Sequence, residues 1–227
     1  MSKNKNILDL EGPILIIGAS GFIGANLLRA CLEKRDDVLG TVFSGDSWRL
    51  DGIAAPHIAF LNLEDQTSVK SLFNRFTPKT VFDCSSFGAY SFEDDYERIH
   101  TTNYVSFIRL MELVSELDLA AYIHAGSSSE YGLNSDAPSE GTSLIPNSHY
   151  SVSKAATSHA IAYYGKVRKI PVVNLRLYSV YGPYEDSSRL IPVLCEHSLR
   201  GTLPTFARAQ VTRDFIHVDD VSASFVE

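Results

Sequence analysis

A glycine-rich turn between an apolar run and a helical pattern constrains the fold of this chain more than any other feature. Ile14–Ile17 is a continuous apolar run, which is typical of a strand buried on both faces. The segment Gly18-Ala-Ser-Gly21-Phe-Ile-Gly24 follows at once, and residues 22–34 carry apolar side chains at helical spacing. Such a turn lets a pyrophosphate approach the backbone at the helix N-terminus. It therefore predicts a dinucleotide-binding unit, although the spacing is GxxGxxG rather than GxGxxG.

Strand-like and helix-like segments alternate along most of the remaining chain. Predicted strands cover residues 38–43, 57–61, 80–84, 120–125 and 172–177, predicted helices cover 65–76, 96–117 and 151–168, and a polar loop covers 132–148. This alternation indicates a parallel sheet with helices on both faces, joined by right-handed crossovers. The predicted fold class is α/β, a Rossmann-type doubly wound parallel sheet.

The alternation stops after residue 178. Beyond it we expect a short helix at 190–199, a short strand at 212–218 and the start of another helix at 219–227. We expect residues 12–178 to form a dinucleotide-binding domain and 179–227 to form an incomplete C-terminal substrate domain. Because the chain ends inside an amphipathic pattern, we expect the rest of that domain to lie outside it.

The composition excludes several classes of function. Hydrophobic residues make up 44% and charged residues 21% of the 227 residues, as in ordinary globular proteins. A net charge of -7 and the lack of a Lys/Arg run argue against nucleic-acid binding. Cys31, Cys84 and Cys195 lack metal-ligand spacing, so we expect no metal site and a reducing, cytoplasmic setting. Residues 1–11 lack a signal-peptide core and no apolar stretch is long enough to span a bilayer, so we expect no membrane partner.

Tyr150 and Lys154 lie four residues apart in a predicted helix, so their side chains can face the same target. A free tyrosine has a pKa of about 10 and is a poor proton carrier at neutral pH. A lysine cation held nearby stabilises the phenolate. The pair predicts an acid–base site, with an ordinary amphipathic helix as the alternative.

The end of the second predicted strand bears on the choice between NAD and NADP. An acidic residue there would bind the adenosine ribose and disfavour a 2′-phosphate. The strand ends at Phe43 and Ser44 with no carboxylate, and Asp46 and Arg49 follow. We expect NAD or NADP, and the Ser44 hydroxyl and Arg49 guanidinium favour NADP. The alternative is that Asp46 reaches back to the ribose and NAD binds.

With these features the chain resembles the extended short-chain dehydrogenase/reductases, specifically the nucleotide-sugar epimerase/dehydratase group. The resemblance covers residues 13–227. It rests on the glycine loop, the Tyr150/Lys154 pair and three further segments, Ala125-Gly-Ser-Ser-Ser-Glu-Tyr-Gly132, Leu175-Arg-Leu-Tyr-Ser-Val-Tyr-Gly-Pro183 and Arg213-Asp-Phe-Ile-His-Val-Asp-Asp220. It implies an NAD(P)-dependent oxidoreductase or isomerase, a nucleotide-sugar substrate, and a homodimer formed through helices such as 96–117 and 151–168.

The resemblance also implies roles for individual residues. Tyr150 would be the acid/base, and Lys154 would hold the nicotinamide ribose. Ser127 would hydrogen-bond the reacting oxygen. Asn103 would support a proton-relay water, with a solvent-facing helix amide as its alternative. The implied cofactor-binding residues are Gly18, Ser20, Gly21, Phe22, Ile23, Gly24, Ser44, Arg49, Asn62, Leu63, Ser85, Ser86, Tyr150, Lys154 and Tyr178.

The implied substrate-binding residues are Ser128, Ser129, Ser179, Arg189 and Arg213. Ser128 and Ser129 are neighbours of Ser127 that could share its role. Arg213 would grip the substrate diphosphate, with a surface ion pair to Asp214 as the alternative.

One departure from the group bears on the reaction. Its 4,6-dehydratases follow the serine or threonine with an acidic residue, whereas Ser128 and Ser129 fill those places here. The nearest carboxylate, Glu130, comes one residue late, and strand-like alternation would turn it to the other face. We therefore expect an epimerase or ketoreductase. A 4,6-dehydratase and a non-catalytic dinucleotide-binding or sensing protein are the alternatives.

Overall fold

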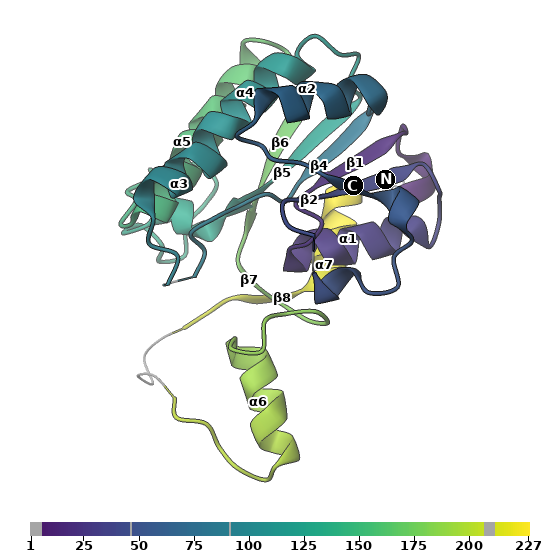
Figure 1. The fold of residues 1–227 in the computed structure, drawn as a ribbon. Coiled ribbons are helices and arrows are strands. Elements are labelled where there is room, and N and C mark those ends of the chain that lie inside the picture. The colour runs from purple at the N-terminus through teal and green to yellow at the C-terminus, as the bar shows by residue number, and fades with distance from the viewer. Residues whose placement is uncertain (1–5, 46, 91, 207–211) are drawn as a thin grey trace.

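The computed structural model describes residues 6–45, 47–90, 92–206 and 212–227 (Figure 1). Asp46, the alternative ribose ligand, lies outside the described residues.

A six-stranded parallel sheet forms the centre of the molecule (Figure 1). Its strands lie in the order β3-β2-β1-β4-β5-β6. They are β1 (Ile14–Ile17), β2 (Val38–Val42), β3 (Ile58–Phe60), β4 (Thr80–Asp83), β5 (Ala121–Ser127) and β6 (Val172–Leu177). Strands β1 to β3 are added toward one edge of the sheet and β4 to β6 toward the other, so the strand order switches between β1 and β4. A ligand crevice is expected at the carboxyl ends of these two strands. The predicted Rossmann-type α/β fold is confirmed.

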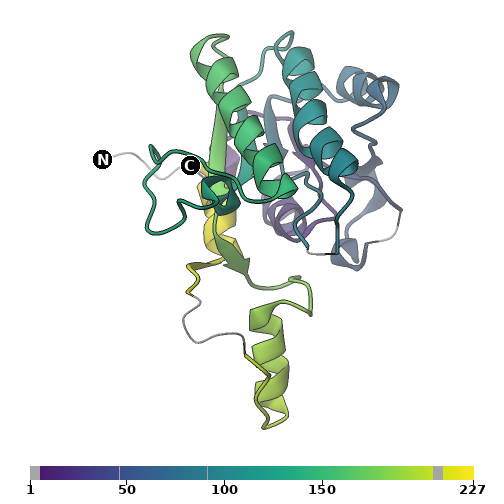
Figure 2. The same ribbon diagram turned by 90° about the vertical axis from the view of Figure 1, so that its left-hand side faces the viewer.

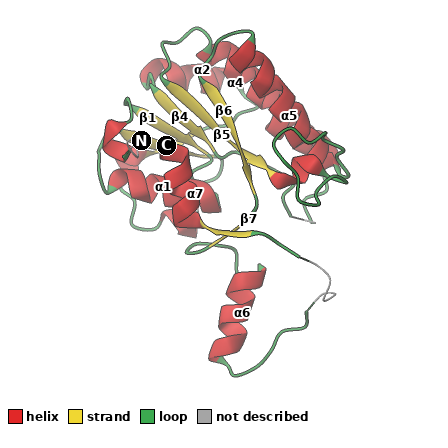
Figure 3. Cartoon of the chain, turned by 180° about the vertical axis from the view of Figure 1, so that it is seen from behind, coloured by secondary structure: helices red, strands yellow, loops and turns green. Residues whose placement is uncertain are grey.

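Helices cover both faces of the sheet (Figure 3). One face carries α1 (Phe22–Leu32) and α7 (Val218–Val226), and the other carries α2 (Gln66–Arg75), α4 (Ser106–Val114) and α5 (His149–Lys166). Successive residues of β1 serve the two cores in turn. Ile14 and Ile16 pack with α1 and α7, while Leu15 and Ile17 pack with α2, α4 and α5. Burial on both faces explains the continuous apolar run of β1.

Helix α5 begins two residues before the predicted start. The cause is Ser148, whose hydroxyl accepts the backbone N–H of Ser151 and so caps the helix. Tyr150 therefore lies in the first turn of α5 and Lys154 one turn later, on a regular helix.

The predicted helix 96–117 is interrupted. It consists of α3 (Tyr96–His100), a π-helical turn at Thr101–Val105, and α4. The π-turn contains Asn103, which is buried. Such turns hold one residue more than a regular turn and are frequent at functional sites. Hydrophobic periodicity alone did not reveal it.

The segment after β6 has two different surroundings. Strands β7 (Ser179–Tyr181) and β8 (Phe215–His217) form a separate parallel pair, and α6 (Leu190–Leu199) stands away from the sheet without a buried residue (Figure 2). In contrast, α7 packs against α1 and contributes Val221 and Phe225 to the core on that face. The division at residue 178 stays a prediction, and the final helix of the second segment packs on the sheet.

None of the helices in the described part of the chain combines the length and apolarity needed to cross a bilayer.

Candidate active site

The glycine loop requires glycine at two positions. Gly18 has a φ of 77°, and a Cβ on it would lie 2.9 Å from the carbonyl carbon of Cys84. A Cβ on Gly24 would lie 2.3 Å from the Gly18 carbonyl oxygen, so α1 approaches the loop too closely for any side chain. Because α1 begins at Phe22, the backbone N–H groups of Phe22 and Ile23 have no partner within the helix. These donors suit a pyrophosphate.

A cavity of about 240 Å³ lies beside this loop, at the carboxyl ends of β1, β2 and β4. Its wall includes seven residues predicted to bind the cofactor, Gly18, Ser20, Gly21, Asn62, Leu63, Ser85 and Ser86. Together with the unpaired helix donors, this cavity suits the part of a dinucleotide that carries the pyrophosphate. Phe22, Ile23, Gly24, Ser44, Arg49, Tyr150, Lys154 and Tyr178 are not part of its wall.

The arginine that lines the cavity near the end of β2 is not the predicted one. The Arg49 Nε donates to the Tyr184 carbonyl oxygen at 2.8 Å, and its guanidinium lies over the Trp48 ring. The cavity wall instead contains Arg98, whose guanidinium carbon lies 4.3 Å and 5.6 Å from the ring centres of Phe87 and Phe43. Sequence reasoning missed Arg98 because it belongs to α3, far along the chain from β2.

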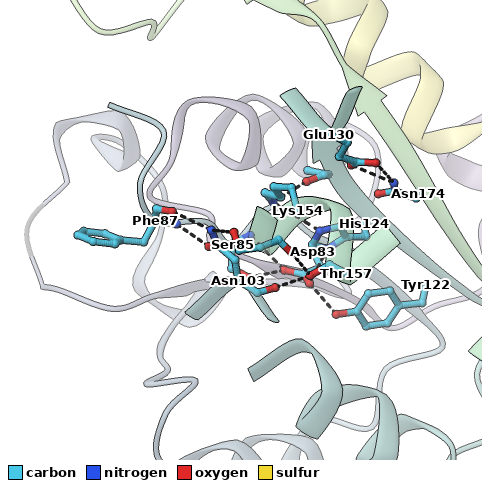
Figure 4. Close-up of polar contacts among 12 residues, drawn as sticks. Asp83, Ser85, Phe87, Asn103, Tyr122, His124, Glu130, Lys154, Thr157 and Asn174 are labelled. Carbon is cyan, nitrogen blue, oxygen red and sulfur yellow. Dashed lines mark hydrogen bonds and ion pairs between the residues drawn. The ribbon is translucent and has the colours of Figure 1, made fainter. Parts of the chain in front are cut away.

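Lys154 is almost completely buried, with 1% of its surface exposed. Its Nζ donates to the Ala125 carbonyl oxygen at 2.9 Å and lies 3.5 Å from Nε2 of His124 (Figure 4). Both contacts are with β5, two and three residues before Ser127. The lysine side chain is thus held against the strand that ends at the predicted catalytic serine.

Asp83 provides a buried negative charge near Lys154. It accepts hydrogen bonds from His124 Nδ1 at 2.9 Å, from the Tyr122 hydroxyl at 2.8 Å and from the Ser85 hydroxyl at 2.6 Å (Figure 4). Burial would raise the pKa of the Asp83 carboxyl, but the contacts with His124, Ser85 and Tyr122 outweigh it and lower this pKa. Burial and the Lys154 cation lower the pKa of His124, which is therefore neutral near pH 7.

Ser127 is the last residue of β5 and is partly exposed. Its hydroxyl oxygen accepts the Ser129 N–H at 3.1 Å, and its own N–H donates to Glu130 Oε1 at 3.0 Å. The predicted strand alternation beyond Ser127 is wrong, because Ser128–Tyr131 forms a 3₁₀ helix. Glu130 is nevertheless fully buried and pairs with Arg176 at 2.6 Å. It is engaged in the structure and is not a free acid.

Asn103 is held inside the protein. Its Oδ1 accepts the Phe87 N–H and its Nδ2 donates to the Phe87 carbonyl oxygen, each at 2.8 Å, and Nδ2 also donates to the Ser153 hydroxyl at 2.9 Å. The alternative of a solvent-facing amide is wrong. The amide ties the loop after β4 to α5, while the Asn103 backbone carbonyl accepts a hydrogen bond from Thr157. Its predicted support of a relay water stays a prediction.

Comparison with known proteins places the chain in a family. Residues 14–226 match the model of the NAD dependent epimerase/dehydratase family. The chain belongs to this family. Among curated relatives, a dTDP-glucose 4,6-dehydratase from Haemophilus influenzae is 27% identical and matches 94% of this chain and 70% of its own length. An uncharacterized UDP-glucose epimerase, YtcB of Bacillus subtilis, is 28% identical, with 91% and 69% covered.

Solved structures show the same likeness to the epimerase/dehydratase family. A UDP-glucuronic acid 4-epimerase from Bacillus cereus, in complex with UDP-glucuronic acid and NAD, has a TM-score of 0.77 and 28% identity. That match covers 92% of this chain and 70% of the epimerase. The chain thus spans about two thirds of the length of these relatives.

The substrate-side residues expected of an epimerase/dehydratase lie on separate segments. Ser128 and Ser129 lie in the 3₁₀ helix after β5, and Ser179 begins β7. Arg189 precedes α6, with its guanidinium carbon 4.5 Å from the centre of the Tyr90 ring. Arg213 is exposed and donates to its neighbour's carbonyl oxygen; among the described contacts it forms no ion pair with Asp214.

Within the described ranges, no group of three or more His, Cys, Asp and Glu side chains is arranged to hold a metal ion.

Proposed function

We propose that this chain carries the catalytic residues of an NAD(P)-dependent nucleotide-sugar epimerase or ketoreductase. The observation that carries the proposal is the burial of Lys154. This lysine lies one helical turn after Tyr150, and its ammonium contacts Ala125 on β5, two residues before Ser127. Burying an ammonium costs free energy unless an opposite charge and hydrogen bonds compensate it. The contact of Lys154 with Ala125, near the carboxyl end of β5 and two residues before Ser127, supports a role in chemistry rather than in folding alone.

Each of the three residues has a distinct part. The Tyr150 hydroxyl makes no hydrogen bond to a described residue, so it is available to take a proton from a sugar hydroxyl and to return it. The Lys154 ammonium stabilises the phenolate. The Ser127 oxygen already accepts from Ser129, which leaves its hydroxyl hydrogen to donate to the reacting oxygen. When bound, the nicotinamide accepts and returns the hydride.

The acid–base groups favour epimerase or ketoreductase over dehydratase. A 4,6-elimination requires a further acid and base at the sugar. Ser128 and Ser129 have no carboxylate, and Glu130 is buried with Arg176. Dehydratases among the relatives keep this reaction as the second candidate.

For the cofactor we propose NADP. Residues 43–45, which follow β2, contain no carboxylate to repel a 2′-phosphate. The cavity wall contains Glu64 and also Arg98, which offers a planar cation to bind the phosphate. The similar UDP-glucuronic acid 4-epimerase contains NAD in its solved structure, so the proposed use of NADP would distinguish this chain from that relative. We also propose a homodimer through α3, α4 and α5, because exposed apolar side chains lie along α5, namely Val152 and Tyr163, and at its C-terminal end, Val167.

Turnover assays test the proposed reaction. The chain is incubated with UDP-, GDP-, CDP- and dTDP-sugars, and products are analysed by NMR for an inverted centre and by absorbance for a keto sugar. With NAD or NADP added we expect inversion of a sugar centre, or, with a keto sugar and NADPH, reduction of the carbonyl with oxidation of NADPH, in both cases without loss of water. Replacement of Tyr150 with Phe should abolish turnover and leave dinucleotide affinity within a few-fold. Loss of water from the sugar would favour the dehydratase, and dinucleotide binding without turnover would favour the non-catalytic sensor.

A further inference from the structure

A buried polar chain beneath Lys154 has no part in the mechanism proposed above. It runs from Ser85 through Asp83 on β4 and His124 on β5 to Lys154 on α5 (Figure 4). The exposed fractions of Asp83, His124 and Lys154 are 1%, 2% and 1%. Three ionisable side chains from three elements rarely share a dry interior unless their charges are matched and their hydrogen bonds are made.

We propose that Asp83 and His124 are positioning residues of the active site, which orient the Lys154 ammonium and supply its counter-charge. The inference rests on the proposed function, because it assumes that Lys154 serves the hydride-transfer reaction.

The hydrogen bonds around His124 determine its tautomer and the orientation of the Lys154 ammonium. The Asp83 carboxylate can only accept, so His124 carries its proton on Nδ1. Its Nε2 then bears a lone pair that faces the Lys154 Nζ at 3.5 Å. An ammonium has three N–H donors. One is used by Ala125, one points toward His124, and the third remains for the ribose or the tyrosine. Two fixed donors set the direction of the third.

The second part of the positioning role is to balance the charge of Lys154. Asp83 is the anion that His124 connects to Lys154, with the imidazole neutral between them. The other ionisable groups around this histidine do not replace it, because Glu130 is paired with Arg176 and the Tyr122 hydroxyl and Cys84 thiol are uncharged at neutral pH. Protonation of His124 would place a second cation beside Lys154 and remove the Nε2 acceptor. The arrangement therefore works only while this histidine is neutral.

Ser85 connects this series of hydrogen-bonded side chains to the cofactor cavity. It lines the cavity wall and donates its hydroxyl hydrogen to Asp83 at 2.6 Å. The carboxylate that balances Lys154 thus also fixes a hydroxyl at the dinucleotide site. We expect changes at Asp83 to alter dinucleotide affinity as well as turnover.

Two substitutions of the same residue separate orientation from mere packing. His124→Gln keeps an amide able to donate toward Asp83 and accept from Lys154, and it does not titrate. His124→Phe keeps a ring but removes both hydrogen bonds. We expect H124F to lower kcat at least about tenfold with the sugar KM within a few-fold, and H124Q to recover most of that loss. In the wild type, kcat should fall as pH decreases through the pKa of His124, which lies below its ordinary value of 6.5, and this part of the decrease should be absent in H124Q.

The decisive outcomes are distinct. A folded H124F protein with wild-type kcat and pH profile would overturn the proposal, as would an H124Q protein as impaired as H124F. Folding of each variant is checked by circular dichroism and thermal unfolding.

A measurement without turnover separates this proposal from the proposed function. In ¹⁵N-histidine-labelled protein, with the His124 signal assigned from H124Q, we expect a neutral Nδ1–H imidazole at pH 7. A charged ring or an Nε2–H tautomer would refute the positioning role. If no nucleotide-sugar reacts, the proposed function fails by itself. The NMR tautomer then still decides whether His124 positions Lys154, with a weakened NADPH affinity of H124F supporting the role and an unchanged affinity contradicting it.

Discussion

The two ends of the candidate active site are built in different ways. At the β4–β5–α5 end, Asp83, His124 and Lys154 are buried and joined by hydrogen bonds between elements. At the β2 end, Phe43 and Arg98 are exposed and meet through a cation–aromatic contact. Buried polar networks leave few alternative arrangements, whereas exposed contacts are weak and easily replaced. We infer that the first end fixes the chemistry and the second adjusts cofactor preference.

The largest expected effect comes from removing the buried cation. Lys154→Met leaves the Asp83 carboxylate buried without its counter-charge, and we expect a loss of about 3–5 kcal/mol in the free energy of unfolding. Turnover should fall below detection, since the phenolate loses its stabilising cation. Urea unfolding measures the first and product formation the second. Lys166→Met, an exposed position on the same helix, is the matched control and should change neither. Equal stability of the two variants would show that the charge of Lys154 does not stabilise the buried end.

The second prediction concerns the buried pair that supports Ser127. Glu130→Gln removes the charge that faces Arg176 and weakens the anchor of the Ser127 N–H. We expect a loss of about 3 kcal/mol in the free energy of unfolding, because a partly buried guanidinium is left unpaired. Glu196→Gln breaks an exposed pair with Arg200 on α6 and should change stability by less than about 0.5 kcal/mol. Similar losses in both variants would show that burial at the β5 end confers no special stability.

The third prediction is a pH dependence of stability that originates at the buried end. The pKa of His124 is lower in the folded protein than its ordinary value of 6.5, so the unfolded chain binds the proton more readily. The stability of the wild type should therefore be full above about pH 6.5 and should decrease as pH falls below it. Asp83, whose pKa is also lowered from 3.8, should add a further loss at more acid pH.

Chemical denaturation at a series of pH values measures this dependence. In H124Q the loss that begins near pH 6.5 should be reduced, and the loss at more acid pH should remain. An unchanged profile in H124Q would assign the upper part of the dependence to other groups.

The sequence predicted the fold well because local signals agreed with the tertiary structure. The apolar run of β1, the strand pattern of β6 and the glycine loop are each typical of a parallel sheet, and their positions are confirmed. Helix α7 was predicted in place but its packing on α1 was not, since periodicity shows that a face is apolar and not what covers it.

The candidate site was predictable in part. Gly18 and Ser85 were named from motifs and line the cavity. Asp83 and His124 were not named, because each looks like an ordinary strand residue until β4 and β5 are paired, with Asp83 opposite His124 in register. Arg98 was missed and Arg49 named instead, since proximity along the chain does not decide which arginine reaches the cavity. Long-range pairing and side-chain direction are what motif reasoning lacks.

The smallest expected effect is at the exposed end of the cavity and concerns cofactor choice. An adenosine 2′-phosphate beside Arg98 would gain a charge-assisted contact, worth about 1.4 kcal/mol or tenfold in affinity at a partly exposed site. Arg98→Ala should weaken NADPH binding by about that factor and leave NADH binding within about twofold. Arg49→Ala is the control, since that guanidinium is engaged with Trp48 and Tyr184, and it should alter neither affinity. Fluorescence titration with both reduced dinucleotides provides the four comparisons. If R49A weakens NADPH and R98A does not, the cation for the phosphate is the one near β2 in the sequence, and the loop after β2 rearranges to deliver it. If neither variant changes the affinity for NADPH relative to NADH, the β2 end does not set the cofactor preference. The inference that this end adjusts cofactor preference would then be wrong.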